Sequence, residues 1–71
     1  MISENVRRIR KAKELSQDKL AKLAGITLTT LVKIESGAND NPTIKTLKKI
    51  ANALEVPVND LLEDESAPNS R

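Results

Sequence analysis

The side chains of this chain can make hydrogen bonds and charge contacts, but they suggest no covalent chemistry. Its 71 residues include no cysteine and no histidine, so a disulfide framework and a thiolate metal site are excluded. Carboxylates gather near the C-terminal end, without a basic or nucleophilic partner set and without a glycine-rich phosphate loop. They are Asp60, Glu63, Asp64 and Glu65. We therefore expect a solvated surface there, no enzyme, no cofactor and no bound metal.

Binding chemistry is concentrated in the segment 25–37, which is bounded by the chain's only two glycines. Thr29 and Lys33 are four residues apart, so they share one face of a helix. A lysine can donate hydrogen bonds to guanine O6 and N7 or to a phosphate, and a threonine hydroxyl can bond a base edge. Leu28 and Val32 lie at the edge of this face. They could contact thymine methyl groups or pack back against the protein.

The elements that position these residues are predicted to be helices. Apolar residues recur at helical spacing, and no stretch shows sustained alternation of apolar and polar residues. The predicted helices span about 3–13, 17–24, 28–36, 44–54 and 58–62. Ser16, Thr27 and Thr43 are typical N-caps, and Gly25 and Gly37 are expected to end helices in the left-handed conformation.

Each predicted helix has an apolar face for a single aliphatic core, since phenylalanine, tyrosine and tryptophan are absent. The inward residues of the first helix are Ile2, Val6 and Ile9. Those of the fourth helix are Ile44, Leu47, Ile50, Ala51 and Leu54. Arg7, Arg8 and Lys11 are expected to face water.

The connection Gly25-Ile26-Thr27 is about as short as two helices can share, and it favours a large crossing angle, the helix-turn-helix geometry. Ala21 must be small where the third helix crosses the second. Gly25 must adopt a conformation that a side chain disfavours. Ile26, Leu31 and Ile34 are then the apolar residues that hold the pair of helices against the core.

The chain from about Val6 to Leu62 resembles the phage-repressor and Cro-like helix-turn-helix family of DNA-binding domains. The similarity is carried by Leu15-Ser16-Gln17, Leu20-Ala21, Ala24-Gly25, Ile34-Glu35-Ser36-Gly37, Asn41-Pro42-Thr43, Leu47 to Leu54, Val56 and Leu61-Leu62. The resemblance implies a compact, all-α, five-helix lambda-repressor-like domain. It also implies that helix 28–36 lies in the major groove of double-stranded DNA, and that the protein binds a palindromic operator as a homodimer.

Further DNA contacts are expected around this helix. The resemblance implies that Gln17 touches the DNA backbone or a base edge, and that the loop after Gly37 approaches phosphates. Ser36 lies on the same outward face as Thr29 and Lys33. The loop lacks the lysine or arginine often found there, and Asp40 would repel phosphate. Its backbone N–H groups and the amides of Asn39 and Asn41 could still bind it.

Two further groups of residues are given structural roles. Arg10 and Glu35 lie at the edges of the inward faces of their helices, and we expect a partly buried ion pair between them, as the family often has. The end of the fourth helix and the fifth helix carry more apolar surface than a short terminal helix needs. The expected dimer interface is Val56, Pro57, Val58, Leu61 and Leu62.

Charge is distributed unevenly along the chain. Residues 1–24 hold seven Lys/Arg and three Asp/Glu, residues 25–54 hold four and two, and residues 55–71 hold one and five. A basic body suggests a polyanion partner, and the acidic end should point away from DNA. No apolar run approaches the roughly 20 residues that span a membrane. We expect a cytoplasmic protein with one domain at 1–63 and a flexible acidic, polar tail at 64–71.

The leading hypothesis from the sequence is a sequence-specific DNA-binding transcriptional regulator, and the family resemblance implies a repressor. Two alternatives remain open. One is the antitoxin of a toxin–antitoxin pair, although such proteins usually add a longer neutralising segment than residues 63–71 provide. The other is a protein-interaction module with a vestigial helix-turn-helix.

Overall fold

A computed structural model describes residues 1–63, and within them the chain forms five helices and no strand. The helices are α1 (Ile2–Ala12), α2 (Gln17–Ala24), α3 (Leu28–Ser36), α4 (Ile44–Leu54) and α5 (Val58–Leu62). The all-α fold class is therefore confirmed, and α1 begins and ends one residue earlier than predicted. The predicted tail at 64–71 lies outside the described residues.

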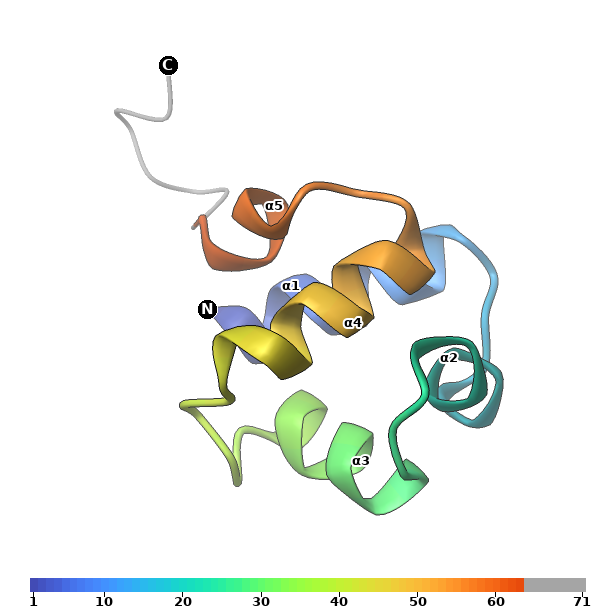
Figure 1. The fold of residues 1–71 in the computed structure, drawn as a ribbon, viewed down its shortest axis with the longest axis horizontal. Helices are drawn as coiled ribbons and strands as arrows, with labels where there is room; N and C mark the ends of the chain where they lie inside the picture. Colours follow the sequence, from blue (N-terminus) through green and yellow to red (C-terminus); the bar gives the residue numbers. More distant parts are fainter. Residues whose placement is uncertain (64–71) are drawn as a thin grey trace.

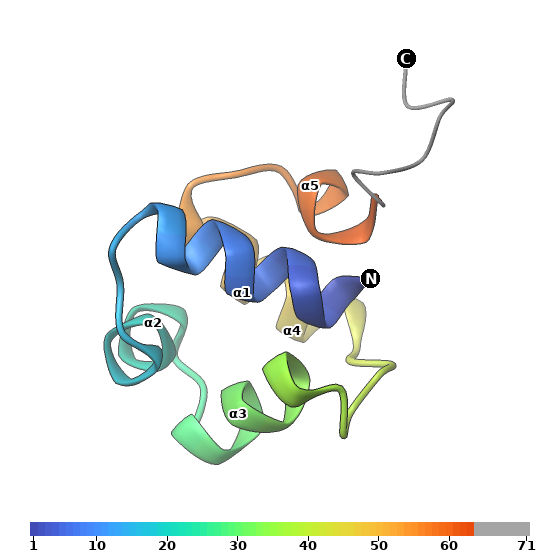
Figure 2. The same ribbon diagram turned by 180° about the vertical axis from the view of Figure 1, so that it is seen from behind.

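The helices pack around one core, with α1 and α4 running across its middle (Figures 1 and 2). α3 contacts α1 and α2, while α2 packs against α4, and α5 closes the opposite side against α1 and α4. The buried apolar residues come from all five helices and are all aliphatic. They are Val6, Ile9, Leu20, Ala21, Ala24, Leu31, Ile34, Leu47, Ile50, Ala51, Leu54 and Leu61.

The helix ends follow the predicted capping residues. The side-chain oxygens of Ser16, Thr27 and Thr43 each accept a hydrogen bond from the backbone N–H three residues later. Gly25 and Gly37 adopt φ angles of 71° and 86°. Because glycine reaches positive φ without steric cost, these residues fix where α2 and α3 end.

Two turns adopt positive φ without a glycine. Glu14, in the α1–α2 connection, has φ of 60°, and Glu55, at the end of α4, has φ of 61°. The left-handed region costs a side chain roughly 1–2 kcal/mol. Both glutamates are exposed, and each turn is closed by a backbone hydrogen bond of the following residue, from Leu15 N–H to the carbonyl oxygen of Arg10 and from Val56 N–H to that of Ala51.

The prediction that Ile44 points into the core is wrong, because this residue is 56% exposed. With about 100° per residue, Ile44 lies roughly 70° from the centre of the buried face of α4. It is also the first residue of the helix. Leu47 is the first α4 residue that the core covers.

Candidate nucleic-acid interface

α3 has one buried and one open face, as the sequence predicts. Leu31 and Ile34 are completely buried and Glu35 is 3% exposed. The opposite face is open to solvent and carries Thr29, Lys33 and Ser36, with Leu28 and Val32 at 43% and 40% exposure. The two apolar residues are therefore not covered by the domain itself, and the whole predicted set is accessible to a partner.

The turn before α3 is held by local hydrogen bonds. The N–H of Ile26 donates to the carbonyl oxygen of Ala21 at 3.0 Å, across Gly25. The hydroxyl oxygen of Thr27 accepts from the N–H of Thr30 at 3.1 Å. Together these bonds define the relative placement of α2 and α3 in the helix-turn-helix unit (Figure 1).

Arg10 and Glu35 form the ion pair that the sequence analysis expects. The Nε of Arg10 lies 2.7 Å from Oε2 of Glu35, and its Nη2 lies 3.0 Å from Oε1. Arg10 also donates to the carbonyl oxygen of Leu15 at 2.7 Å. Such a two-bond contact fixes the geometry of the guanidinium and carboxylate groups, so it ties α1 to the recognition-helix candidate α3.

Gln17 belongs to the same network. Its Nε2 donates to Oε1 of Glu35 at 3.0 Å, which holds the side chain at the start of α2 against the end of α3. One amide N–H and the acceptor Oε1 of Gln17 remain for another partner. The predicted contact of Gln17 with DNA stays a prediction, and it would be made by a side chain that Glu35 already orients.

Arg7 is a member of this network that the sequence analysis missed. It was expected to face water, but its Nη1 donates to the backbone carbonyl oxygen of Glu35 at 2.8 Å. A carbonyl in the last turn of a helix lacks a partner within the helix, which explains why this acceptor is open to Arg7. The signal was available, because Arg7 precedes Arg10 by three residues and so lies on a neighbouring part of the same face.

The loop after α3 is tightly bonded to itself. The N–H of Asn39 donates to the carbonyl oxygen of Lys33 at 3.0 Å, and its Oδ1 accepts from the N–H of Asn41 at 3.1 Å. The hydroxyl of Ser36 donates to the backbone carbonyl oxygen of Lys33 at 3.2 Å and accepts from the N–H of Ala38 at 3.3 Å. The side-chain amides of Asn39 and Asn41 are exposed, so their N–H groups are available to donate to a phosphate. Contact of these two residues with phosphate remains a prediction.

The residues expected to form a dimer interface divide into two sets. Leu61 is completely buried, so the prediction is wrong at this position. It anchors α5 in the core, and Asn5 of α1 donates to its carbonyl oxygen at 2.9 Å. Pro57 and Leu62 are exposed and Val56 and Val58 are half-buried, so these four remain accessible to a second copy of the chain.

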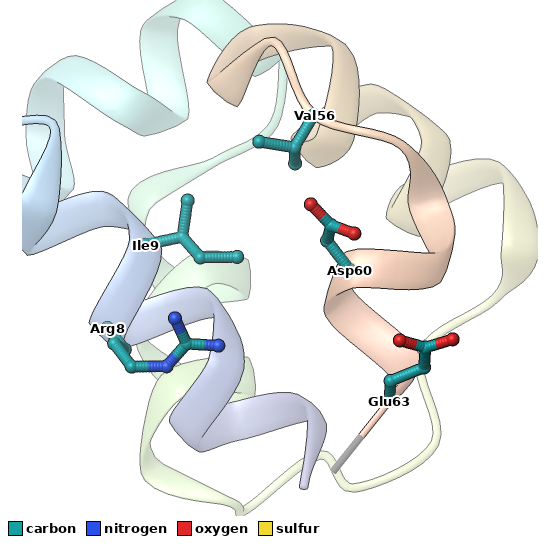
Figure 3. Close-up of a pocket in the computed structure, with 5 residues that line it drawn as sticks. All are labelled: Arg8, Ile9, Val56, Asp60 and Glu63. Atoms are coloured by element: carbon teal, nitrogen blue, oxygen red, sulfur yellow. The ribbon is translucent and has the colours of Figure 1, made fainter. Parts of the chain in front are cut away.

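A small hollow lies between α1 and the segment from the end of α4 through α5. It has a volume of about 270 Å³ and is lined by Arg8, Ile9, Val56, Asp60 and Glu63. Figure 3 shows Arg8 and Ile9 on one wall and the two carboxylates on the other. Ligand pockets usually measure about 300–1,000 Å³, and this hollow lies on the opposite side of α1 from α3.

Among the described residues no group of carboxylates could hold a metal ion, and no helix is long and apolar enough to cross a membrane.

Comparison with known proteins identifies the unit formed by α2 and α3. The helix-turn-helix family model matches residues 6–61. The chain belongs to the helix-turn-helix family. This match confirms the resemblance to phage-repressor and Cro-like domains. The members of this family and the relatives of this chain described below are transcriptional regulators rather than enzymes.

Among its relatives in Bacillus subtilis are two named transcriptional regulators. The chain is 38% identical to SlrR over 66 residues, which cover 93% of this chain and 43% of SlrR. It is 36% identical to SinR over 64 residues, which cover 90% of this chain and 58% of SinR. The chain thus spans about half the length of the curated relatives it matches.

Solved structures give the same result for the fold. The N-terminal DNA-binding domain of SinR from Bacillus subtilis superposes with a TM-score of 0.88 at 34% identity, covering 94% of this chain and 97% of that domain. A crystal structure of SinR in complex with DNA superposes with a TM-score of 0.86 at 36% identity, covering 89% of this chain and all of that one. The five-helix arrangement is therefore that of a DNA-binding domain.

Proposed function

We propose that this chain is a sequence-specific DNA-binding regulator of transcription, acting as a repressor, with α3 in the major groove. The observation that supports this most is the open face of α3. It presents Thr29 and Lys33, with the accessible apolar residues Leu28 and Val32 along one edge, and no carboxylate. Glu35, the one acid of α3, is buried against Arg10.

The side chains of this face suit base edges in the major groove. Lys33 donates to guanine O6 or N7, Thr29 bonds a base edge, and the apolar residues meet thymine methyl groups. Residues around this set bind the phosphate backbone of the DNA, and these contacts position α3 without reading the base sequence. They are Gln17, Ser36, Asn39 and Asn41.

The active form in this proposal is a homodimer on a palindromic operator. One domain of this size offers few base contacts, and two copies about 34 Å apart place both copies of α3 in successive major grooves. The accessible apolar residues Val56, Pro57, Val58 and Leu62 form the contact. α5 and the segment before it lie on the far side of the core from α3 (Figure 1), which leaves both reading faces free.

Selection of duplexes from a random-sequence pool tests the proposal. We expect an enriched, palindromic motif whose half-site spacing reports the dimer geometry. Replacing Thr29 and Lys33 by alanine should lower affinity for that motif by at least roughly 30-fold, because each good base contact gives about 1–3 kcal/mol of discrimination and about 1.4 kcal/mol is a factor of ten. Lys11→Ala, an exposed change on α1, is the control and should leave binding of the motif nearly unchanged. Enrichment of no motif at low salt and micromolar protein would contradict the proposal.

A further inference from the structure

The positive charge of this domain does not lie mainly on its proposed reading helix. α3 carries one lysine, Lys33, and one carboxylate, Glu35, which is paired with Arg10. The loop 38–41 adds Asp40 and no lysine or arginine. A DNA-binding surface made only of α3 and this loop would therefore offer phosphates a single cationic side chain.

α4 supplies a second group of cations. Lys45, Lys48 and Lys49 follow the i, i+3, i+4 spacing that places side chains on one helix face, and all three are exposed. With about 100° per residue, the centre of this lysine stripe lies roughly 160° from the centre of the buried face of α4. The three ammonium groups therefore point directly away from the core.

Within residues 1–63 the lysine stripe (Lys45, Lys48 and Lys49) has no compensating negative charge in contact with it. α4 contains no aspartate or glutamate, and no carboxylate of residues 1–63 is in ion-pair contact with these lysines. Like charges one turn apart destabilise a helix. A polyanion that binds across the stripe would remove this repulsion and would release its own counterions at the same time.

The position of the stripe indicates which polyanion it meets. Residues 37–43 join the end of α3 to the start of α4, and both views draw the first turn of α4 as the turn of that helix nearest to the last turn of α3 (Figures 1 and 2). A helix in the major groove has a phosphate strand on each side of it, because the groove is only about 12 Å wide. From Lys45 to Lys49 the stripe extends about 6 Å along the helix axis, close to the axial rise of two nucleotides of one strand at about 3.4 Å each.

We infer that Lys45, Lys48 and Lys49 form a second DNA contact, which binds the phosphate strand beside the groove that α3 occupies. This inference rests on the proposed DNA-binding function. An acidic protein partner is the competing occupant of the stripe. DNA is favoured because the stripe begins in the first turn of α4, after the loop that follows the reading helix, and because residues 38–41 of that loop include no lysine or arginine.

The salt dependence of binding to a mixed-sequence duplex tests the inference, since phosphate contacts are independent of sequence. The variants are Lys48→Gln with Lys49→Gln, the charge-retaining pair Lys48→Arg with Lys49→Arg, and a charge-matched control, Lys11→Gln with Lys13→Gln. All of the replaced residues are exposed, and thermal melting of each variant reports whether the fold is retained.

Affinity falls as salt rises, and each lost phosphate contact makes the slope of log affinity against log salt less steep by about 0.9. The Lys48, Lys49 glutamine pair should therefore reduce the magnitude of this slope by about 1.8. From about 50 to 200 mM salt, the wild type should then lose roughly 12-fold more affinity than this variant. The arginine pair and the Lys11, Lys13 control should keep the wild-type slope. Adding Lys45→Gln should bring the total change in slope to about 2.7.

Two results would overturn the inference. An unchanged slope in the Lys48, Lys49 glutamine pair would show that these lysines do not meet phosphates and would direct the search to an acidic protein. An equal loss in the Lys11, Lys13 control would show that net charge alone matters. Absence of salt-dependent DNA binding by the wild type would refute the proposed function itself, so the two failures are distinguishable.

Discussion

Replacing Glu35 by leucine tests the role of the buried network most directly. The change leaves the guanidinium of Arg10, 9% exposed, without its carboxylate, and it removes the acceptor of Gln17. Breaking a buried ion pair by removing one partner costs about 3–5 kcal/mol, because an uncompensated charge stays buried. Arg7 keeps its bond, since it donates to the backbone oxygen of residue 35.

This cost is large for so small a domain. At about 0.05–0.15 kcal/mol per residue, a chain of 71 residues has a free energy of unfolding of roughly 4–11 kcal/mol. Urea denaturation followed by circular dichroism, with a fixed slope, should therefore show Glu35→Leu losing about a quarter or more of the wild-type stability.

The double variant Arg10→Met with Glu35→Leu separates charge burial from packing. It removes both charges, so it should be much more stable than Glu35→Leu alone and should lie within about 2 kcal/mol of wild type. The remaining loss includes the bond from Arg10 to the carbonyl oxygen of Leu15, which contributes about 0.5–1.5 kcal/mol. A cost below about 1 kcal/mol for Glu35→Leu would mean that water reaches Arg10 and would refute the reasoning.

Three further changes have defined expectations. Gln17→Glu places a second carboxylate beside Glu35 in place of an amide donor 3.0 Å away, and urea denaturation should show a loss of about 1–3 kcal/mol; a neutral result would argue against the contact. Glu55→Gly relieves a φ of 61° and should raise the stability by up to about 1 kcal/mol, with Asn52→Gly, inside the last turn of α4, as a destabilising control. Lys22→Ala removes an ion pair to Asp18 whose side chains are 77% and 62% exposed, and thermal melting should detect a change below about 0.5 kcal/mol; a larger effect would show a role beyond this pair.

The helices could be predicted from the sequence because several local signals agreed. Ser16, Thr27 and Thr43 mark the starts of three helices, and Gly25 and Gly37 mark two ends. The turns at Glu14 and Glu55 gave no such signal, since a glutamate does not mark a positive φ and the backbone hydrogen bonds that close each turn cannot be read from residue type. Spacing alone also misplaced Ile44, because the first residue of a helix can extend beyond the core that its later turns meet.

The sequence was enough to predict which residues of the candidate site face outward, but not which hydrogen bonds hold the site together. The angular positions of Leu28, Thr29, Val32, Lys33 and Ser36 follow from the helical repeat alone, and all are accessible. The bonds of Arg7 and Gln17 to residue 35 depend on how α1, α2 and α3 meet. Leu61 shows the same limit, because an apolar residue on a short helix suits a core and an interface equally until its neighbours are known.

Residue 35 connects the stability of this domain to its reading face. A carboxylate on the open side of α3 would repel phosphates on both sides of the groove. An aliphatic residue at position 35, on the buried side, would leave Arg10 and Gln17 without a common acceptor. Buried at 3% exposure, Glu35 receives bonds from α1 through Arg7 and Arg10 and from α2 through Gln17. A helix of nine residues is marginal on its own, so its orientation must come from such contacts. The same residue therefore keeps negative charge off the proposed DNA surface and sets the angle at which that surface is presented.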